Sequence, residues 1–306
     1  MLHRFQAPPY GGGNQFLLAL VGELRRRGLD IRGTRGVTRR TRACLFNSIN
    51  FDPAWLESLS GSTCRKVHRI DGPIGIYRGT DNEVDRRIWE MNQRFADVTI
   101  LQSRYSLEAH LSIDLRFRSP VVIPNAVDPA IFHSRSRRPR DPARKIRLIS
   151  TAWSDNPGKG ASTYKWIEDH LDWNRFEYTF IGRSPIRFDR IRTLPPLPSG
   201  PLSDELRAHD VYVTASRNDA CSNALLEALA CGLPALALRS GGNPELVAEG
   251  GVLFEGTGDV MEKLAELAAS YEEKQAAIRV ASLAEVADRY LSVLFPGSPA
   301  GPGGDR

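Results

Sequence analysis

Apolar positions along the first 130 residues follow two alternating periods. Residues 16–24 and 84–95 place apolar side chains at helical spacing, so each segment would present one apolar face. Short apolar runs at 98–101 and 121–123 are instead typical of buried strands, and 107–111 is helical again. Helices that alternate with short buried strands predict a doubly wound parallel sheet of the α/β class.

The same alternation resumes after residue 145. Strands are expected at 146–149, 176–181, 211–213 and 233–238, and helices at 161–171, 222–231 and 271–294. Between the two runs, residues 134–145 have no apolar face and include two prolines. We interpret this segment as a solvated interdomain linker, and the alternative is a basic patch that faces an anionic partner or a membrane surface.

The pattern therefore predicts two Rossmann-like domains, at 1–133 and 146–270. A helix at 271–295 is expected to pack back toward the first domain, and the Pro/Gly-rich end, 296–306, to be disordered. The length agrees with this organisation, because 306 residues suffice for two domains of about 130–150 residues each.

Composition narrows the class of protein. Hydrophobic residues make up 41% and charged residues 25% of the chain, as in soluble globular proteins. No apolar run of about 18 residues predicts a membrane-spanning helix, and residues 1–5 lack the apolar core of a signal peptide, so a cytoplasmic protein is expected. The cysteines, at positions 44, 64, 221 and 231, have no zinc-site spacing, so buried free thiols and no bound metal are expected.

Basic residues outnumber acidic ones and are nearly all arginines. The formal net charge is +5, and since six of the 41 basic residues are lysines, 35 are arginines. The planar guanidinium group suits phosphates and other anions. No nucleic-acid-binding motif accompanies this charge, so a nucleic-acid partner is not expected.

The most informative segment is 216–247. A strand is expected to end just before it, after which Ser222 and Asn223 open one helix and Pro244 opens a second. Helix N-termini carry unpaired N–H groups that bind phosphate, and open α/β sheets bind ligands at the carboxyl ends of their strands. Asp219 lies in the first turn and Glu227 on the first helix. The segment therefore predicts a ligand site with two carboxylates beside it.

Two glycine-containing loops follow expected strands. Residues 150–160 end in Gly158-Lys159-Gly160, and a lysine flanked by glycines at such a place can reach a phosphate. Residues 8–15 contain three consecutive glycines before the first helix, which allows a ligand to approach the backbone closely. The alternatives are an exposed loop lysine and a plain strand-to-helix turn.

Segment 216–247 resembles the donor-site signature of family 4 retaining glycosyltransferases, which have the GT-B fold. That signature has an acidic residue, seven intervening residues, a glutamate on a helix reading like EALACGLP, and then GG.PE. Here Asp219 and Glu227 hold the acidic positions, and 228–245 holds the rest. The resemblance covers roughly residues 5–295, is strong from 146 to 247 and loose before 120, and implies two Rossmann-like domains that face a central cleft.

The resemblance also implies roles on the donor side. Lys159 would bind the donor diphosphate, Glu227 the ribose hydroxyls and Asp219 the transferred sugar. Further donor-binding residues would be Gly12, Gly13, Gly158, Gly160, Arg183, Ser222, Asn223, Ala224, Gly241 and Gly242. Two positions depart from the family pattern: Asp219 stands where glutamate is usual, and Ser154 where an arginine often binds the diphosphate. Diphosphate binding would then depend on Lys159, on helix N-termini and on Arg183 or Arg239.

Acceptor-side residues would be Asn14, His68, Asp71 and Arg78. Residues 68–79 resemble acceptor-side loops of some bacterial members, and the Gly-rich loop that contains Asn14 faces the cleft in this family. His68 would orient the sugar or the acceptor, and the alternative is a packed structural histidine. Residues 123–132 resemble the family's passage into the second domain, where a hinge is expected.

The activity that the resemblance implies is metal-independent transfer of a hexose from a nucleotide sugar, with UDP- or GDP-sugar as co-substrate and no cofactor. The acceptor would be a saccharide, a lipid-linked or a small molecule, in polysaccharide biosynthesis at the inner face of the membrane. Two alternatives are another enzyme on the same fold, namely a nucleotide-sugar epimerase or a sugar-phosphate synthase, and a non-catalytic nucleotide-sugar-binding subunit.

Overall fold

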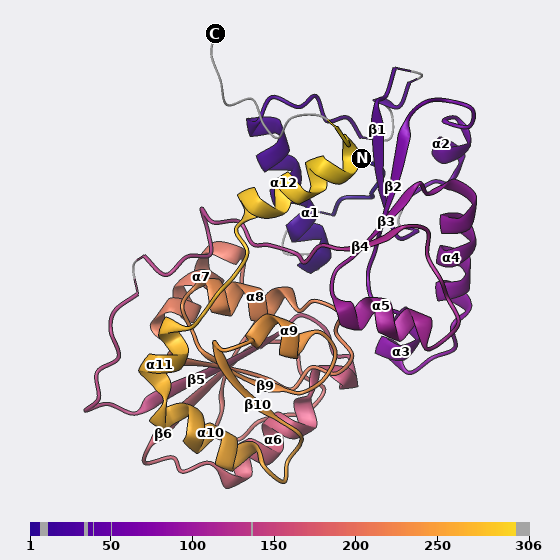
Figure 1. Ribbon diagram of the computed structural model, residues 1–306. Coiled ribbons are helices and arrows are strands. Elements are labelled where there is room, and N and C mark those ends of the chain that lie inside the picture. The colour runs from indigo at the N-terminus through magenta and orange to yellow at the C-terminus, as the bar shows by residue number, and fades with distance from the viewer. Residues whose placement is uncertain (7–11, 34–35, 39, 50, 136, 298–306) are drawn as a thin grey trace. The chain divides into compact units, whose positions relative to one another are not determined.

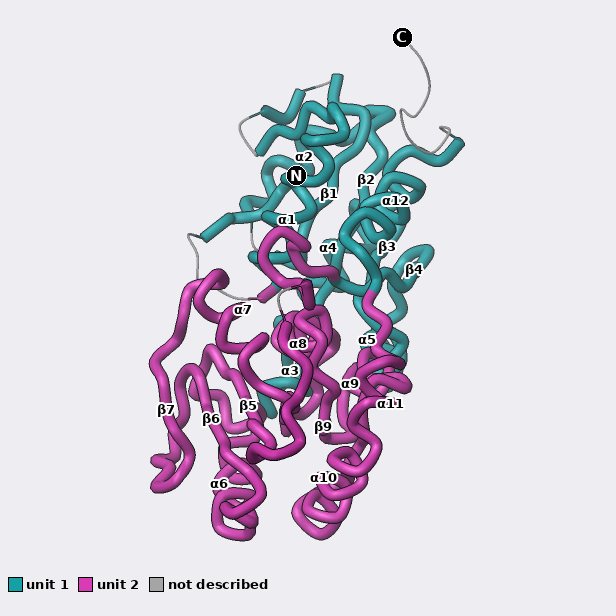
Figure 2. The backbone as a smooth tube through the Cα atoms, turned by 90° about the vertical axis from the view of Figure 1, so that its left-hand side faces the viewer, with its two compact units in different colours: residues 1–7, 13–125, 281–306 teal, residues 8–12, 126–280 magenta. Residues whose placement is uncertain are grey.

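A computed structural model describes residues 1–6, 12–33, 36–38, 40–49, 51–135 and 137–297 (Figure 1). The chain divides into two compact units, which Figure 2 colours separately. Unit 1 comprises residues 1–7, 13–125 and 281–306, and unit 2 comprises 8–12 and 126–280. The boundary after Asn125 lies eight residues before the expected end of the first domain at 133, and the C-terminal segment returns to unit 1.

Unit 1 is built on a parallel sheet with strand order β1-β2-β3-β4. Its strands are β1 (Ala43–Asn47), β2 (Arg65–Ile70), β3 (Val98–Leu101) and β4 (Pro120–Val122). Its helices are α1 (Gly12–Arg26, in this unit from Gly13), α2 (Ala54–Glu57), α3 (Ile74–Arg78), α4 (Glu83–Phe95), α5 (Arg104–Leu111) and α12 (Leu283–Leu294). Figure 1 shows α1 and α12 on one side of the sheet and α2 and α4 on the other, so both faces are covered.

Hydrophobic periodicity explains most of these elements. All four residues of β3 are buried, and α1 buries the apolar stripe of Phe16, Leu17, Leu20, Val21 and Leu24. Strands β1 and β2 were not expected from the pattern, since β2 reads RKVHRI. His68 and Arg69 therefore lie in a buried strand, whereas the resemblance placed them in a loop; this expectation was wrong.

Unit 2 contains a parallel sheet of six strands in the order β10-β9-β8-β5-β6-β7. The strands are β5 (Ile146–Ala152), β6 (Phe176–Gly182), β7 (Arg192–Leu194), β8 (Val211–Thr214), β9 (Ala235–Leu238) and β10 (Gly251–Phe254). The helices are η2 (Pro157–Lys159, a 3-10 turn), α6 (Ala161–His170), α7 (Ser199–Ala208), α8 (Asn223–Ala230), α9 (Asn243–Val247), α10 (Val260–Ala269) and α11 (Tyr271–Ala276). In chain order this is the 3-2-1-4-5-6 arrangement of Rossmann sheets, whose strand order reverses between β5 and β8.

The segment expected as an interdomain linker, residues 134–145, lies inside unit 2 and not between the units, and most of its described residues are exposed. Two of its arginines bind other parts of unit 2. Arg144 donates two hydrogen bonds, at 2.5 and 2.7 Å, to the buried carboxylate of Asp210. Arg137, whose side chain is 7% exposed, donates to the carbonyl of His209 and to the hydroxyl of Tyr271, each at 2.6 Å. The partners of these two guanidinium groups thus belong to the chain itself.

The expected helix at 271–294 is two helices that belong to different units. Helix α11 ends at Ala276 in unit 2, and α12 begins in unit 1 after Ser282, which forms a capping box with Glu285. Within unit 1, α12 packs on α1, since the rings of Phe16 and Tyr290 lie with their centroids 5.9 Å apart. Arg27, just after α1, donates to the carbonyl of Ala284 at 2.9 Å. The expected disorder of 296–306 concerns a segment of which residues 298–306 lie outside the described part of the chain. In the described part, no helix combines the length and apolar character needed to cross a bilayer.

Candidate active site

Two loops of unit 2 meet where its strand order reverses. The loop after β5 carries Lys159, and the loop after β8 carries Asp219, sixty positions further along the chain. The ammonium nitrogen Nζ of Lys159 lies 2.9 Å from Oδ2 of Asp219 and 3.5 Å from the hydroxyl of Ser216. The structure thus brings together two of the three expected catalytic residues, at the position where open α/β sheets bind ligands.

Glycines permit this close approach. Gly160 has φ of 85°, and a Cβ there would lie 2.4 Å from Cβ of Ala215 at the end of β8. Gly241 has φ of 61°, and a Cβ there would lie 2.4 Å from the carbonyl oxygen of Asp219. Neither position has room for a side chain, and both φ values lie in the left-handed region that favours glycine. Gly158 accepts a hydrogen bond from the backbone of Arg217 at 2.8 Å, which joins the same two loops.

Asn243 holds the loops after β8 and β9 together, and sequence reasoning gave it no role. Its buried amide donates to the carbonyl of Ser216 at 3.2 Å and to that of Leu238 at 3.0 Å. Gly242 donates from its backbone to the carbonyl of Asp219 at 2.8 Å. Asn243 directly follows the expected Gly241-Gly242 pair, and a polar residue opening a helix is the signal that could have identified it.

Helix α8 begins beside these loops and carries Glu227. Ser222 caps the helix by accepting from the backbone of Leu225, while the partly buried Asn223 and Ala224 form its first turn. Burial raises the pKa of Glu227 to about 8. No hydrogen bond or ion pair reaches this carboxyl from the described residues, so its acceptor oxygens are available to a ligand.

The other expected phosphate-binding side chains lie at the same edge but have local partners. Arg183, exposed just after β6, lies over the ring of Trp153 with its guanidinium carbon 5.4 Å from the centroid. Arg239 is paired with Glu255 at 2.5 Å. Ser154, which stands in place of the family's arginine, is partly buried in the loop after β5. Only Lys159, among these cations, is paired with another expected site residue.

A polar pocket of about 460 Å³ lies within unit 1 at the carboxyl ends of β1 and β2. Its lining residues are His3, Arg4, Gln6, Gly13, Asn14, Asn47, Ile49, Phe51 and Asp71. Three of these were expected site residues: Gly13 and Asn14 at the start of α1, and Asp71 after β2. Asn14 exchanges two hydrogen bonds of 3.0 Å with the backbone of Gln6. Gly12 opens α1, but residues 7–11 of the Gly-rich loop lie outside the described part of the chain.

His68 does not reach this pocket and is a packed structural histidine. The side chain is fully buried, stacks on Phe46 with ring centroids 4.2 Å apart, and uses both ring nitrogens, toward the carbonyl of Ser48 and the amide of Asn92. Burial lowers its pKa to about 3, so the ring is neutral. Its expected contact with sugar or acceptor is therefore wrong. Arg78 is exposed in the last turn of α3 and is not among the residues that line the pocket.

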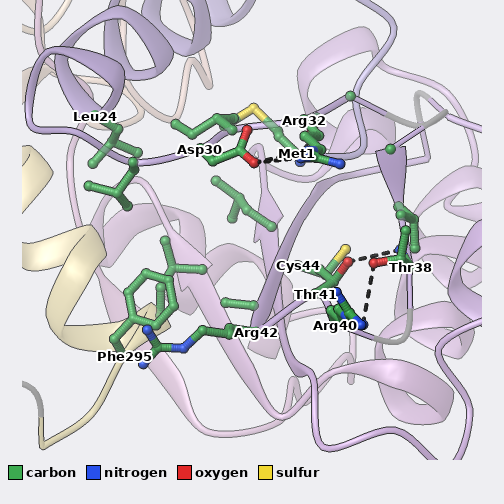
Figure 3. A pocket seen from close by; sticks show the side chains of 18 of the residues that line it. Met1, Leu24, Asp30, Arg32, Thr38, Arg40, Thr41, Arg42, Cys44 and Phe295 are labelled. Carbon is green, nitrogen blue, oxygen red and sulfur yellow. Dashed lines mark hydrogen bonds and ion pairs between the residues drawn. The ribbon is translucent and has the colours of Figure 1, made fainter.

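A second pocket of unit 1, of about 920 Å³, lies near the first residues of β1 (Figure 3). Figure 3 shows Arg42 beside the ring of Phe295, and the guanidinium carbon is 5.3 Å from the ring centroid. Cys44 on β1 and Leu24 on α1 also line this pocket. Ligands of open α/β sheets bind at the carboxyl ends of strands, so its position argues against a direct part in the chemistry.

Comparison with known proteins agrees with the architecture. Residues 177–270 match the family model for glycosyl transferases group 1. Sucrose-phosphate synthase from Thermosynechococcus elongatus is similar with a TM-score of 0.65 at 16% identity, covering 96% of this chain and 83% of that one. Anabaena HepE, solved in complex with UDP-glucose, has a TM-score of 0.58 at 16% identity, with 82% and 74% covered. The fold is GT-B.

The similar proteins found by sequence are also named glycosyltransferases. A D-inositol 3-phosphate glycosyltransferase of Corynebacterium glutamicum is 32% identical over 142 residues, which are 46% of this chain and 29% of the relative. The protein of that name from Streptosporangium roseum is 33% identical over 118 residues, with 38% and 25% covered. The matched region therefore spans less than a third of these relatives. The resemblance to glycosyltransferases is confirmed, whereas membership of family 4 stays a prediction.

Proposed function

We propose that this GT-B chain is a retaining, metal-independent glycosyltransferase that uses a nucleoside-diphosphate sugar. The observation that carries the proposal is the Lys159–Asp219 pair of 2.9 Å, held at the reversal point of a Rossmann-ordered sheet beside the N-terminus of α8. A cation and a helix N-terminus suit a diphosphate, and the neighbouring carboxylate suits sugar hydroxyls. The family match over 177–270 includes Asp219 and Glu227 but begins after Lys159.

The residues allow an electrostatic mechanism. The bond between the anomeric carbon and the diphosphate oxygen breaks, and its electrons leave with the nucleoside diphosphate. The acceptor oxygen attacks on the face that the leaving group vacates, and the acceptor proton passes to a departing phosphate oxygen. Lys159 and the N–H groups at the start of α8 stabilise the charge that grows on the leaving group. Asp219 then contacts the transferred sugar.

Glu227 would bind the donor ribose. Its carboxyl has no partner among the described residues, and its raised pKa reflects burial that a pair of hydroxyl donors would compensate. HepE was solved with UDP-glucose and another GT-B neighbour with UDP and GlcNAc, so a UDP-sugar is the first donor to test, followed by a GDP-sugar.

The polar pocket of unit 1 would hold the acceptor, through Asn14 and Asp71. The curated relatives are named for D-inositol 3-phosphate, which makes a cyclitol or another polyol the first acceptor class to test. A saccharide or lipid-linked acceptor at the inner face of the membrane, in the cytoplasm, remains part of this proposal.

The deciding experiment measures thermal stabilisation by UDP, GDP, ADP and their sugars in the presence of EDTA, followed by nucleoside diphosphate release with and without polyols. Stabilisation by one nucleotide and polyol-dependent release are expected for the wild type. Lys159→Ala should lose release, and Lys263→Ala should not, because the ion pairs of Lys263 within the described residues are with glutamates on its own helix, α10. Nucleotide binding without any release, with every acceptor tested, would instead support a non-catalytic binding subunit.

A further inference from the structure

A closed ring of polar side chains lies at the carboxyl edge of the sheet in unit 1. Arg69 donates to Oδ1 of Asn47 at 2.6 Å, to Oδ1 of Asp71 at 3.0 Å and to Oδ1 of Asn125 at 2.8 Å. Asn125 donates to Oε1 of Gln102 at 2.9 Å, and Gln102 donates to Oδ1 of Asp71, which closes the ring. Each of the four strands thus contributes a side chain from its carboxyl end.

The ring is buried except at one member. Arg69 is fully buried, and Asn47, Gln102 and Asn125 are each at most 4% exposed, whereas the side chain of Asp71 is 44% exposed. Burying a guanidinium group is costly unless several acceptors surround it, and here it also lies 5.3 Å from the ring centroid of Phe16. A strand position that holds a charge at this cost indicates a task beyond packing. Asn47 and Asp71 both line the polar pocket, and Asp71 is the exposed one of the two.

The two carboxylate oxygens of Asp71 differ. Oδ1 accepts from both Arg69 and Gln102, whereas the one contact to Oδ2 within the described residues is a 3.3 Å hydrogen bond from the hydroxyl of Ser48. The ring therefore fixes the orientation of the carboxylate and leaves Oδ2 with capacity to accept from a ligand. Nearby, burial lowers the pKa of His3, and its buried Nε2 has no partner in the described part of the chain.

We infer that Asp71 binds a hydroxyl of a polyhydroxylated acceptor through Oδ2. The buried Arg69 is the positioning residue that orients this carboxylate. Asn125 and Gln102 complete the orientation because they engage the second guanidinium nitrogen and the shared Oδ1 atom. The inference rests on the proposed function for the identity of the pocket as an acceptor site. It also gives a reason why β2 carries a buried arginine, namely to orient the carboxylate of Asp71.

The test compares Arg69→Lys, Arg69→Met, Gln102→Met and Asp71→Asn in the full chain. Melting temperature reports folding, donor hydrolysis without acceptor reports the donor site, and the acceptor KM and kcat of transfer report the pocket. We expect Arg69→Lys and Gln102→Met to raise the acceptor KM about tenfold while donor KM and hydrolysis stay within twofold. Arg94→Met is the matched control, since Arg94 also makes an ion pair and lies over an aromatic ring but is exposed.

Several outcomes would overturn the inference. If Asp71→Asn raises the acceptor KM while Arg69→Lys and Gln102→Met leave it unchanged, Arg69 does not act through Asp71. If donor and acceptor parameters fall together with melting temperature, the role is structural only. Saturation-transfer NMR with myo-inositol and glucose gives a readout that needs no turnover. Polyol binding that depends on Arg69, in a protein with no transferase activity, would support the ring and contradict the proposed function.

Discussion

Lys159 and Asp219 form an ion pair of 2.9 Å between two loops of unit 2, although sixty positions separate them. Their side chains are 23% and 18% exposed, so the pair contributes little to stability, about 1 kcal/mol or less. Its significance is positional, because it holds an ammonium group at the point where the strand order reverses. A bound diphosphate would compete with Asp219 for that ammonium and leave the carboxylate to the sugar.

Replacing Lys159 tests this position directly. Lys159→Ala should reduce kcat by about 10²–10³, since the charge on the leaving group grows toward the transition state, and donor affinity by less than tenfold. Lys159→Arg should restore little of the lost kcat, because the guanidinium group is larger than an ammonium group and planar. Steady-state kinetics with calorimetric donor affinity would measure both. A normal turnover number for Lys159→Ala would rule out the proposed role.

Glu227 should reduce stability at alkaline pH. Its folded pKa of about 8 lies above the unfolded value of 4.5, so the folded state binds more protons in this window and stability falls as pH rises through it. The free energy of unfolding of Glu227→Gln should be close to that of the wild type at pH 4 and larger than it at pH 9. The difference should be at most about 1.4 kcal/mol per unit of pKa shift. The same variant should bind the nucleoside diphosphate roughly tenfold more weakly, through weakened hydrogen bonds from the ribose hydroxyls.

The measurement for Glu227 is a series of melting curves from pH 4 to pH 9, with nucleotide affinity determined at pH 7.5. Glu245→Gln, at an exposed position on α9, is the control and should show no such pH trend. Equal donor affinity of Glu227→Gln and wild type would remove the ribose assignment even if the stability trend is found.

Much of the fold followed from hydrophobic spacing, and the exceptions have a physical cause. The helix expected at 161–171 is α6, and the strand expected at 176–181 is β6, because apolar residues mark both clearly. Strand β2 was missed because three of its six residues are Arg or Lys and one is His. The buried Arg69 has acceptors that are distant in sequence, such as Asn125, 56 positions further on, and no local pattern carries that information.

Candidate site residues could be predicted from the sequence where they lie together in one contiguous segment. Asp219, Glu227 and the two glycines at 241–242 follow from a contiguous pattern. The pairing of Lys159 with Asp219 and the polar ring around Arg69 depend on strand order instead, which spacing along the chain does not determine. Whether these residues bind a donor and an acceptor stays a prediction.

His68 should make stability depend on acidic pH. Its folded pKa of about 3 lies below the unfolded value of 6.5, so the unfolded state binds more protons and stability falls as pH drops from 6.5 to 3. The slope from this residue is at most about 1.4 kcal/mol per pH unit. His68→Gln should make the free energy of unfolding depend less on pH between pH 4 and 6.5. His170→Gln, at an exposed position, should not have this effect. An unchanged slope in His68→Gln would show that the ring is protonated or solvated in the folded protein.

The arginine-rich segment 134–145 should stabilise unit 2. Arg144→Ala would leave the carboxylate of Asp210, 1% exposed, with the backbone N–H of Arg147 and Arg137 at 3.9 Å as its partners among the described residues. The cost should be about 2–4 kcal/mol. Arg138→Ala changes an exposed arginine of the same segment and should alter stability by less than about 0.5 kcal/mol. Urea denaturation of both variants measures the difference. If both prove neutral, the segment behaves as a solvated linker after all, and the hydrogen bonds of Arg144 contribute nothing measurable in solution.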